Sequence, residues 1–223
     1  DQMPALIAES RIPLSVAGLM QQRLRSGKQD WKDNYFDTGD AIVYHPDGRV
    51  KIVLDSQLLR DINPKSELLN GALVLVDGVY ETLQGPEFTR EKLAKITERD
   101  LALEEVKTHP FWQTLARDGA LLNEYADSMG AEMKQRFKYD SAMGVYLASA
   151  EKTPTARAAY VYRLGSWSRL YGWYRLDNDN GRLVGVCQEP VVLGHLANQR
   201  FAQAPEALVS LDKMHLAAPC KVI

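Results

Sequence analysis

The most regular pattern of apolar positions lies near the middle of the chain and predicts a long helix. Asp118 precedes it and can accept hydrogen bonds from the first unpaired backbone amides, as N-cap residues do. Beyond that cap, residues four apart share one face of a helix. The apolar residues at this spacing are Leu121, Tyr125, Met129, Met133 and Phe137. We therefore expect a helix over residues 119–138.

Shorter helical signals precede this segment. Thr89 can cap one helix, and Thr97 with Asp100 resembles the cap of another. Pro110 suits the first turn of a further helix, because proline lacks the N–H group that this turn leaves unpaired. Together these signals predict a helical block over about residues 89–138.

Two β-hairpins are predicted before the helical block. Gly48 and Gly78 lie in their turns, since glycine adopts the left-handed backbone conformation that closes tight hairpins. The apolar segments on either side of these turns are residues 40–45 with 49–54, and residues 72–76 with 79–83.

Strand patterns return after the helical block. The segments are residues 142–149, 158–164, 169–176 and 182–187, the last two joined as a hairpin around Asn180-Gly181. Because strands and helices occur in separate blocks, the predicted class is α+β. We expect two blocks of mainly antiparallel β-hairpins, at about 40–83 and 142–187, separated by the helical block, with short helices at both ends.

The domain organisation follows from these blocks. Residues 1–34 form an N-terminal arm with a short amphipathic helix, which we expect to pack on its own domain rather than on a membrane or a partner. Its apolar residues are Val16, Leu19, Met20 and Leu24. A hairpin lobe over 35–85 and a larger unit over 86–223 come next, and the two could form one domain. In the tail, residues 205–211 are the best candidate helix.

Composition removes several classes of protein. The chain has 223 residues, with 27 Lys and Arg against 29 Asp and Glu, so it lacks the overall basic field of a dedicated nucleic-acid binder. The longest stretch without a charge, Ile12 to Gln22, has 11 residues, too few to span a membrane. The chain starts at Asp1, so the start of the native protein may be missing. Its localisation is open, with the cytoplasm slightly favoured.

The sequence contains none of the common local motifs for catalysis or metal binding. The four histidines have no metal-ligand spacing, so no metal site is predicted, and the catalytic residues and cofactors are unknown. His109 is the first candidate for a titrating group, although a capping or packing role is favoured. Cys187 and Cys220 are either ordinary thiols or one disulfide that ties down the tail.

Residues 152–175 differ most from the average composition. This stretch has five basic residues, no acidic residue and six of the 19 aromatic residues. Guanidinium groups beside aromatic rings can hold an anion while a ring stacks. The candidate ligand-binding residues are Arg163, Trp167, Arg169, Tyr171, Trp173 and Arg175.

Strand alternation sharpens this hypothesis. Arg169, Tyr171, Trp173 and Arg175 would share one face of a strand, whereas Leu170, Gly172, Tyr174 and Leu176 would share the core face. The alternatives are a half-exposed face in which arginine stems cover rings without any ligand, or a face covered by the helical block.

The favoured function is a soluble binding or interaction module that uses this Arg and aromatic sheet face to hold an anionic or ring-containing ligand, such as a small molecule, or a partner. An enzyme with a composite active site is the first alternative, with His109 or His45 beside carboxylates and with Arg169 or Arg175 as an anion clamp. The second is a homo-oligomeric assembly protein that packs its arm and aromatic face against another copy.

Overall fold

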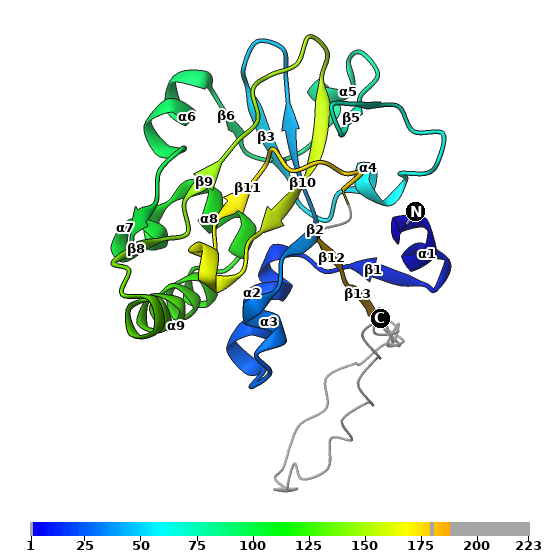
Figure 1. The fold of residues 1–223 in the computed structure, drawn as a ribbon. Coiled ribbons are helices and arrows are strands. Elements are labelled where there is room, and N and C mark those ends of the chain that lie inside the picture. Colours follow the sequence, from blue (N-terminus) through cyan, green and yellow to red (C-terminus); the bar gives the residue numbers. More distant parts are fainter. Residues whose placement is uncertain (1, 179–180, 188–223) are drawn as a thin grey trace, which may run out of the picture.

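Two long antiparallel strands, β2 (Phe36–Tyr44) and β10 (Thr155–Val161), form the centre of the fold (Figure 1). They belong to a computed structural model that describes residues 2–178 and 181–187. The two strands lie far apart in the sequence, one in each predicted strand block. Both blocks therefore contribute to one sheet, and the predicted α+β class is confirmed.

Shorter strands complete this sheet along both edges of the central pair. Beside β2 lie β3 (Val50–Val53), which continues to β6 (Glu87–Phe88), and β12 (Arg182–Leu183). Beside β10 lie β5 (Ala72–Val74) with β4 (Leu68–Leu69), and β11 (Leu170–Tyr171) with β9 (Val145–Tyr146). Each central strand is thus flanked by different strands at its two ends.

The remaining elements surround this sheet. Strands β1 (Arg11–Pro13) and β13 (Gly185–Cys187) pair and join the two ends of the described chain, and β7 (Leu101–Ala102) pairs with β8 (Ser141–Ala142). The α-helices are α1 (Gln2–Ala8), α2 (Val16–Arg25), α3 (Asp30–Asp33), α4 (Gln57–Arg60), α5 (Val79–Thr82), α6 (Arg90–Ile96), α7 (Leu103–Thr108), α8 (Pro110–Ala116) and α9 (Gly119–Phe137). A short 3-10 turn, η1, covers Leu164–Ser166.

Alternation along β2 separates two apolar cores. Ile42 and Tyr44 face a large core shared with α2, α8 and α9, whereas Ala41 and Val43 face a smaller core under α4 and α5. Figure 1 shows helices α6 to α9 on one side of the sheet and α4 and α5 on the other. The helical block therefore covers one face only.

Several local predictions are confirmed. Asp118 caps α9 by accepting a hydrogen bond from the Ala120 N–H at 2.8 Å, and Thr89 caps α6. Pro110 is the first residue of α8, and Gly48 closes the β2–β3 hairpin with a φ of 91°. These elements depend on contacts between residues close in sequence, so the pattern of residue types along the chain is enough to predict them.

The cap predicted at Thr97 and Asp100 is wrong. Residues 101–102 form β7, and α7 begins only at Leu103. The Glu105 carboxylate accepts a hydrogen bond from the Ala102 N–H at 2.9 Å and so satisfies this helix start. The Asp100 carboxylate instead accepts a hydrogen bond from Arg169, which lies far away in the sequence.

Two of the three predicted hairpins are also wrong. Gly78, with a φ of 82°, leads into α5 rather than a strand, because a helical turn buries Tyr80 in the smaller core. Segments 169–176 and 182–187 do not pair with each other. The unoccupied edges of β10 and β2 take β11 and β12 instead, and β13 pairs with β1.

The N-terminal helix packs on its own fold, as expected. Val16, Leu19 and Met20 of α2 are buried in the large core. No helix among the described residues is long and apolar enough to cross a membrane. The predicted tail helix at 205–211, together with His195, His215 and Cys220, lies outside the described residues, so the pairing of Cys187 with Cys220 is not tested.

Arg23 of α2 ties the helices to the sheet from inside the protein. Its side chain is only 1% exposed. The guanidinium donates to Tyr125 Oη and Ser168 Oγ at 2.8 and 2.9 Å, and to the backbone oxygen of Tyr162 at 2.9 Å. It also donates to the carbonyl oxygens of Trp31 and Asn34. All of these partners are neutral, so they solvate the charge without an ion pair.

Replacement of Arg23 should therefore be costly. We expect Arg23→Met to lower the free energy of unfolding by about 3–5 kcal/mol, because several buried acceptors lose their donor. Arg25→Met, at an exposed position of the same helix, should change it by less than about 0.5 kcal/mol. Urea denaturation of both variants measures the difference. Equal stability of the two variants would show that Arg23 does not hold the fold.

Candidate functional site

At one end of the sheet, the face turned away from the large core is lined by aromatic residues. Tyr160 of β10 pairs across the sheet with Asp37 on β2 and with Tyr171 on β11. Directly paired residues point to the same side of a sheet. Their chain neighbours Phe36, Val161 and Leu170 point to the large core instead. We call this outer surface the tyrosine face; its rings are Tyr35, Tyr160, Tyr162, Tyr171, Trp173 and Tyr174.

The rings of the tyrosine face touch one another in a continuous network. Tyr160 stacks on Tyr174 with their centroids 3.9 Å apart. Tyr162 contacts Tyr35 edge-on at 4.8 Å and Tyr171 at 4.2 Å. Trp173 meets Tyr171 edge-on at 5.1 Å. Contacts of this kind fix ring orientations, so the surface is rigid before anything binds to it.

The network is buried at its centre and open at its margin. Tyr160 is 1% exposed, and burial raises its pKa. Tyr35, Tyr162 and Tyr174 are half-buried, and Trp173 is 44% exposed. A partner molecule could therefore contact the ring surfaces without any rearrangement of the sheet.

Asp37 places a carboxyl group among these rings. Its side chain is half-buried, and burial raises its pKa from 3.8 to about 7. No described residue donates a hydrogen bond to the carboxylate. A Cβ at Gly181 would collide with it, so only glycine fits against this group.

The structure brings half of the predicted site residues to this surface. Tyr171 and Trp173 belong to the tyrosine face, and exposed Arg163 lies at its edge with its guanidinium 5.4 Å from the centroid of the Tyr35 ring. Among the described residues, no carboxylate lies within ion-pair distance of Arg163.

Arg169 and Trp167 form a stack that adjoins the tyrosine face, where Arg169 donates to Tyr171 Oη at 3.4 Å. The Arg169 guanidinium binds both carboxylate oxygens of Asp100, at 2.7 and 2.5 Å. It also lies 4.4 Å from the ring centroid of Trp167 and 4.9 Å from that of Tyr146. Trp167 stacks in turn on Tyr139 at 4.6 Å. Because Asp100 already holds this guanidinium, Arg169 does not present a free anion clamp.

The predicted alternation over 169–176 is wrong beyond Gly172. Strand β11 ends at Tyr171, and a Cβ at Gly172 would collide with the Tyr44 hydroxyl, which donates to the Gly172 carbonyl at 2.8 Å. After this close approach the chain bends. Tyr174, expected on the core face, stacks on Tyr160, whereas Arg175 turns outward and pairs with Asp177 at 2.8 Å.

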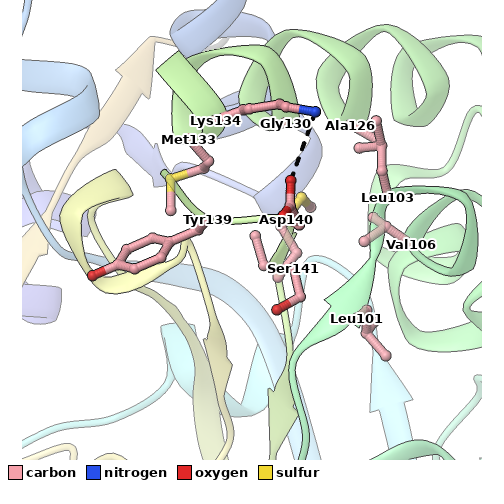
Figure 2. A pocket seen from close by; sticks show the side chains of 12 residues that line it. Leu101, Leu103, Val106, Ala126, Gly130, Met133, Lys134, Tyr139, Asp140 and Ser141 are labelled. Atoms are coloured by element: carbon pink, nitrogen blue, oxygen red, sulfur yellow. Dashed lines mark ion pairs between the residues drawn. The ribbon is translucent and has the colours of Figure 1, made fainter. Parts of the chain in front are cut away.

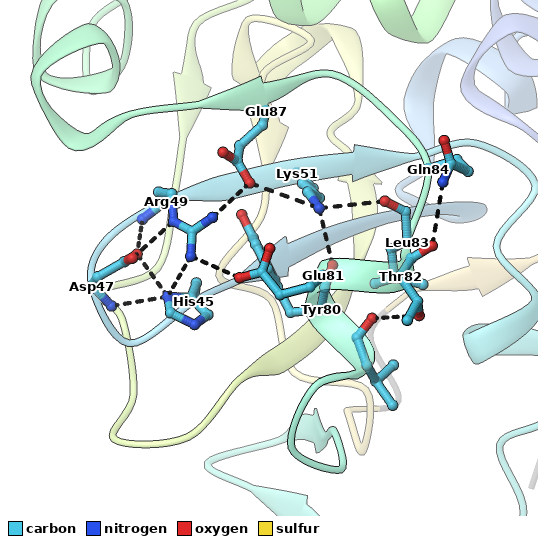
Figure 3. Close-up of polar contacts among 11 residues, drawn as sticks. His45, Asp47, Arg49, Lys51, Tyr80, Glu81, Thr82, Leu83, Gln84 and Glu87 are labelled. Carbon is cyan, nitrogen blue, oxygen red and sulfur yellow. Dashed lines mark hydrogen bonds and ion pairs between the residues drawn. The ribbon is translucent and has the colours of Figure 1, made fainter.

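The histidines named for an enzyme lie away from the tyrosine face. His45 follows the far end of β2, about 25 Å from Asp37 along the strand. There it contacts Asp47 at 2.7 Å within a charged cluster in which Arg49 binds Asp47, Glu81 and Glu87 (Figure 3).

His109 is buried in the helical block. Its Nε2 lies 2.7 Å from the Ile96 carbonyl, and burial lowers its pKa. Neither histidine can act on a molecule held at the tyrosine face. The described residues also contain no group of three or more His, Cys, Asp or Glu side chains placed to hold a metal.

Two hollows lie elsewhere on the molecule. An apolar cavity of about 170 Å³ opens between α7, α9 and the β7–β8 pair, with the exposed ion pair of Lys134 and Asp140 beside it (Figure 2). A larger, open hollow of about 1280 Å³ lies between the N-terminal arm and the strands β12 and β13. Neither contains a residue of the tyrosine face or of the predicted site.

Comparison with known proteins supports the fold. No family model matches the chain, and no curated protein is similar to it. One solved structure, described as "Accommodation of massive sequence variation in Nanoarchaeota by the C-type lectin fold", superposes with a TM-score of 0.59. The alignment covers 75% of this chain and 84% of that one, with 16% identity. The chain shares the C-type lectin fold.

Within this C-type lectin fold, sequence reasoning missed much of the tyrosine face. Tyr160 and Tyr162 were visible in the aromatic stretch, and their spacing by two in a predicted strand was the available signal. Tyr35 and Asp37 have the same spacing before the first hairpin. Nothing in the sequence indicated that these two pairs lie on neighbouring strands, because β2 and β10 meet only through long-range pairing.

The raised pKa of Asp37 predicts a pH-dependent stability. The folded protein keeps a proton that the unfolded chain releases between about pH 4 and pH 7. The contribution of Asp37 to stability is therefore full below this window and is lost as the pH rises through it. The side chain of Asp37→Asn cannot titrate. The free energy of unfolding of this variant, relative to the wild type, should therefore rise by about 2–3 kcal/mol between pH 5 and pH 8.

Urea denaturation at both pH values measures this difference. Asp77→Asn, the same change at an exposed turn, is the matched control and should follow the wild type. If Asp37→Asn also follows the wild type at both pH values, the carboxyl is not buried as described.

Proposed function

We propose that this chain is a non-enzymatic binding module that holds a ring-containing ligand on the tyrosine face. The observation that carries the proposal is the open margin of the ring network, where Trp173 is 44% exposed beside half-buried Tyr162 and Tyr174. Aromatic side chains supply large contact areas at a low entropy cost, and they dominate many recognition surfaces.

The backbone beneath the rings is held in place before binding. Arg157 is buried and donates to the carbonyl oxygens of Tyr174 and Asn70, at 3.1 and 2.9 Å. Arg23 holds the Tyr162 carbonyl from the other side. A surface that is already ordered loses little conformational entropy when a ligand binds, which favours affinity.

The similar C-type lectin fold from Nanoarchaeota is described as accommodating massive sequence variation. Such tolerance means that the fold does not dictate surface residues, so the ligand of this chain is inferred from its own side chains. Neither of the two histidines that the structure describes lies near the tyrosine face, which favours binding over catalysis for this surface.

Removal of Trp173 tests the proposal. The probes are methyl glycosides, nucleosides and phenyl-bearing amines, measured separately by saturation-transfer NMR. We expect at least one class to bind, and Trp173→Ala to weaken that binding at least tenfold, because a stacking surface is lost. Val76→Ala removes a 77% exposed apolar side chain elsewhere and should leave binding unchanged.

Both variants should keep the melting temperature of the wild type, since neither side chain is buried. Failure of every probe class to bind, or equal affinity of Trp173→Ala and the wild type, would contradict a binding function for this face.

A further inference from the structure

We propose that the ligand of the tyrosine face is an organic cation, whose ammonium group is held by the Asp37 carboxylate and the surrounding tyrosine rings. The inference rests on the proposed function and specifies its ligand class. It reverses the charge expected from the sequence, where five basic residues indicated an anion.

Three of the five basic residues of the aromatic stretch, Arg157, Arg169 and Arg175, are already engaged. Asp100 binds Arg169 through both carboxylate oxygens, and Asp177 binds Arg175 in the same way. Arg157 is buried against backbone carbonyls. An incoming anion would have to displace an internal carboxylate to reach Arg169 or Arg175. Arg163 lies at the edge of the tyrosine face without an ion-pair partner among the described residues.

Asp37 shows the opposite situation. Its carboxylate receives no hydrogen bond from a described residue, although burial makes an unsolvated negative charge costly. A cation in contact with this group would recover that cost. Arg163, the other charge here without an ion-pair partner among the described residues, is exposed to solvent. The charge that burial leaves poorly solvated at this surface is therefore the negative one of Asp37, which lies in register with the central ring, Tyr160.

The rings complete the site for a cation. The faces of tyrosine rings carry negative electrostatic potential, which attracts ammonium groups within about 6 Å of the ring centroid. The chain already uses this contact: Lys51 Nζ lies 4.6 Å from the Tyr80 centroid, and Lys92 Nζ lies 5.0 Å from that of Phe88. Several rings beside one carboxylate form the arrangement that suits an alkylammonium ion.

Replacement of Arg163 gives a second test of the ligand's charge, with an effect opposite to that of replacing Asp37. Its guanidinium lies over Tyr35, two residues before Asp37 in the sequence, where it repels a second cation and covers a ring face. Arg163→Ala should therefore strengthen the binding of a cation and weaken that of an anion. A ligand recognised by shape alone would be affected only slightly.

The experiment compares choline with 3,3-dimethyl-1-butanol, its neutral isostere. NMR titrations are made at pH 8, where Asp37 is ionised. We expect the wild type to bind choline at least tenfold more tightly than the isostere. Asp37→Asn should bind the two within twofold of each other, and Asp77→Asn should keep the wild-type preference. Arg163→Ala should bind choline at least twofold more tightly than the wild type.

The outcomes separate this inference from the proposed function. The proposal of a cationic ligand is overturned if the wild type binds choline and its isostere with equal affinity. It is also overturned if Asp37→Asn keeps the wild-type preference for choline. Tighter binding of an anionic probe, such as benzoate, with loss in Arg163→Ala, also overturns it. In each of these cases a ring probe that depends on Trp173 leaves the binding function intact.

Discussion

A guanidinium group buried without a carboxylate underlies the tyrosine face. Arg23 reaches from α2 through the core to the end of β10, where it holds the Tyr162 carbonyl and the Ser168 hydroxyl. Five neutral acceptors from α3, α9 and the loop after β10 solvate it. Because these acceptors would lose a charged donor without it, Arg23 holds these segments in one mutual arrangement. The rings are displayed on the far side of this fixed support.

The tyrosine face lies where the described outer layer of the fold leaves part of the sheet uncovered. At one end, α4 and α5 bury Ala41 and Val43 in the smaller core. At the other end no helix formed by residues 2–178 or 181–187 covers the same face, and the tyrosines of β10 and β11 take the place of an apolar layer. Their rings pack on one another as a core would, while their margin stays open to solvent. A polar group at this border, Asp37, is half-buried and receives no hydrogen bond from any residue that the structure describes, and that combination is unusual for a purely structural surface.

The sequence was sufficient where the determining contacts are local. The apolar ladder from Leu121 to Phe137 and the turn at Gly48 each depend on interactions between residues close in sequence. Both elements, helix α9 and the β2–β3 hairpin, form as predicted. It was insufficient where an unoccupied sheet edge decided the outcome, as for β12 beside β2, or where burial of Tyr80 favoured a helix after Gly78. The candidate site shows the same limit. Composition located the aromatic residues, but the ion pairs that neutralise Arg169 and Arg175 come from Asp100, far away in sequence, and from Asp177 after a bend.

These pairings change the chemistry expected of the surface from basic to acidic, and the position of a bound cation is the most direct evidence for that change. A crystal soaked in choline chloride at pH 8 would supply it. The account predicts ordered density for the trimethylammonium group in contact with the Asp37 carboxylate and the tyrosine rings. Density confined to the apolar cavity beside α9, or a tyrosine face without bound choline at a concentration that saturates the protein in solution, would contradict it.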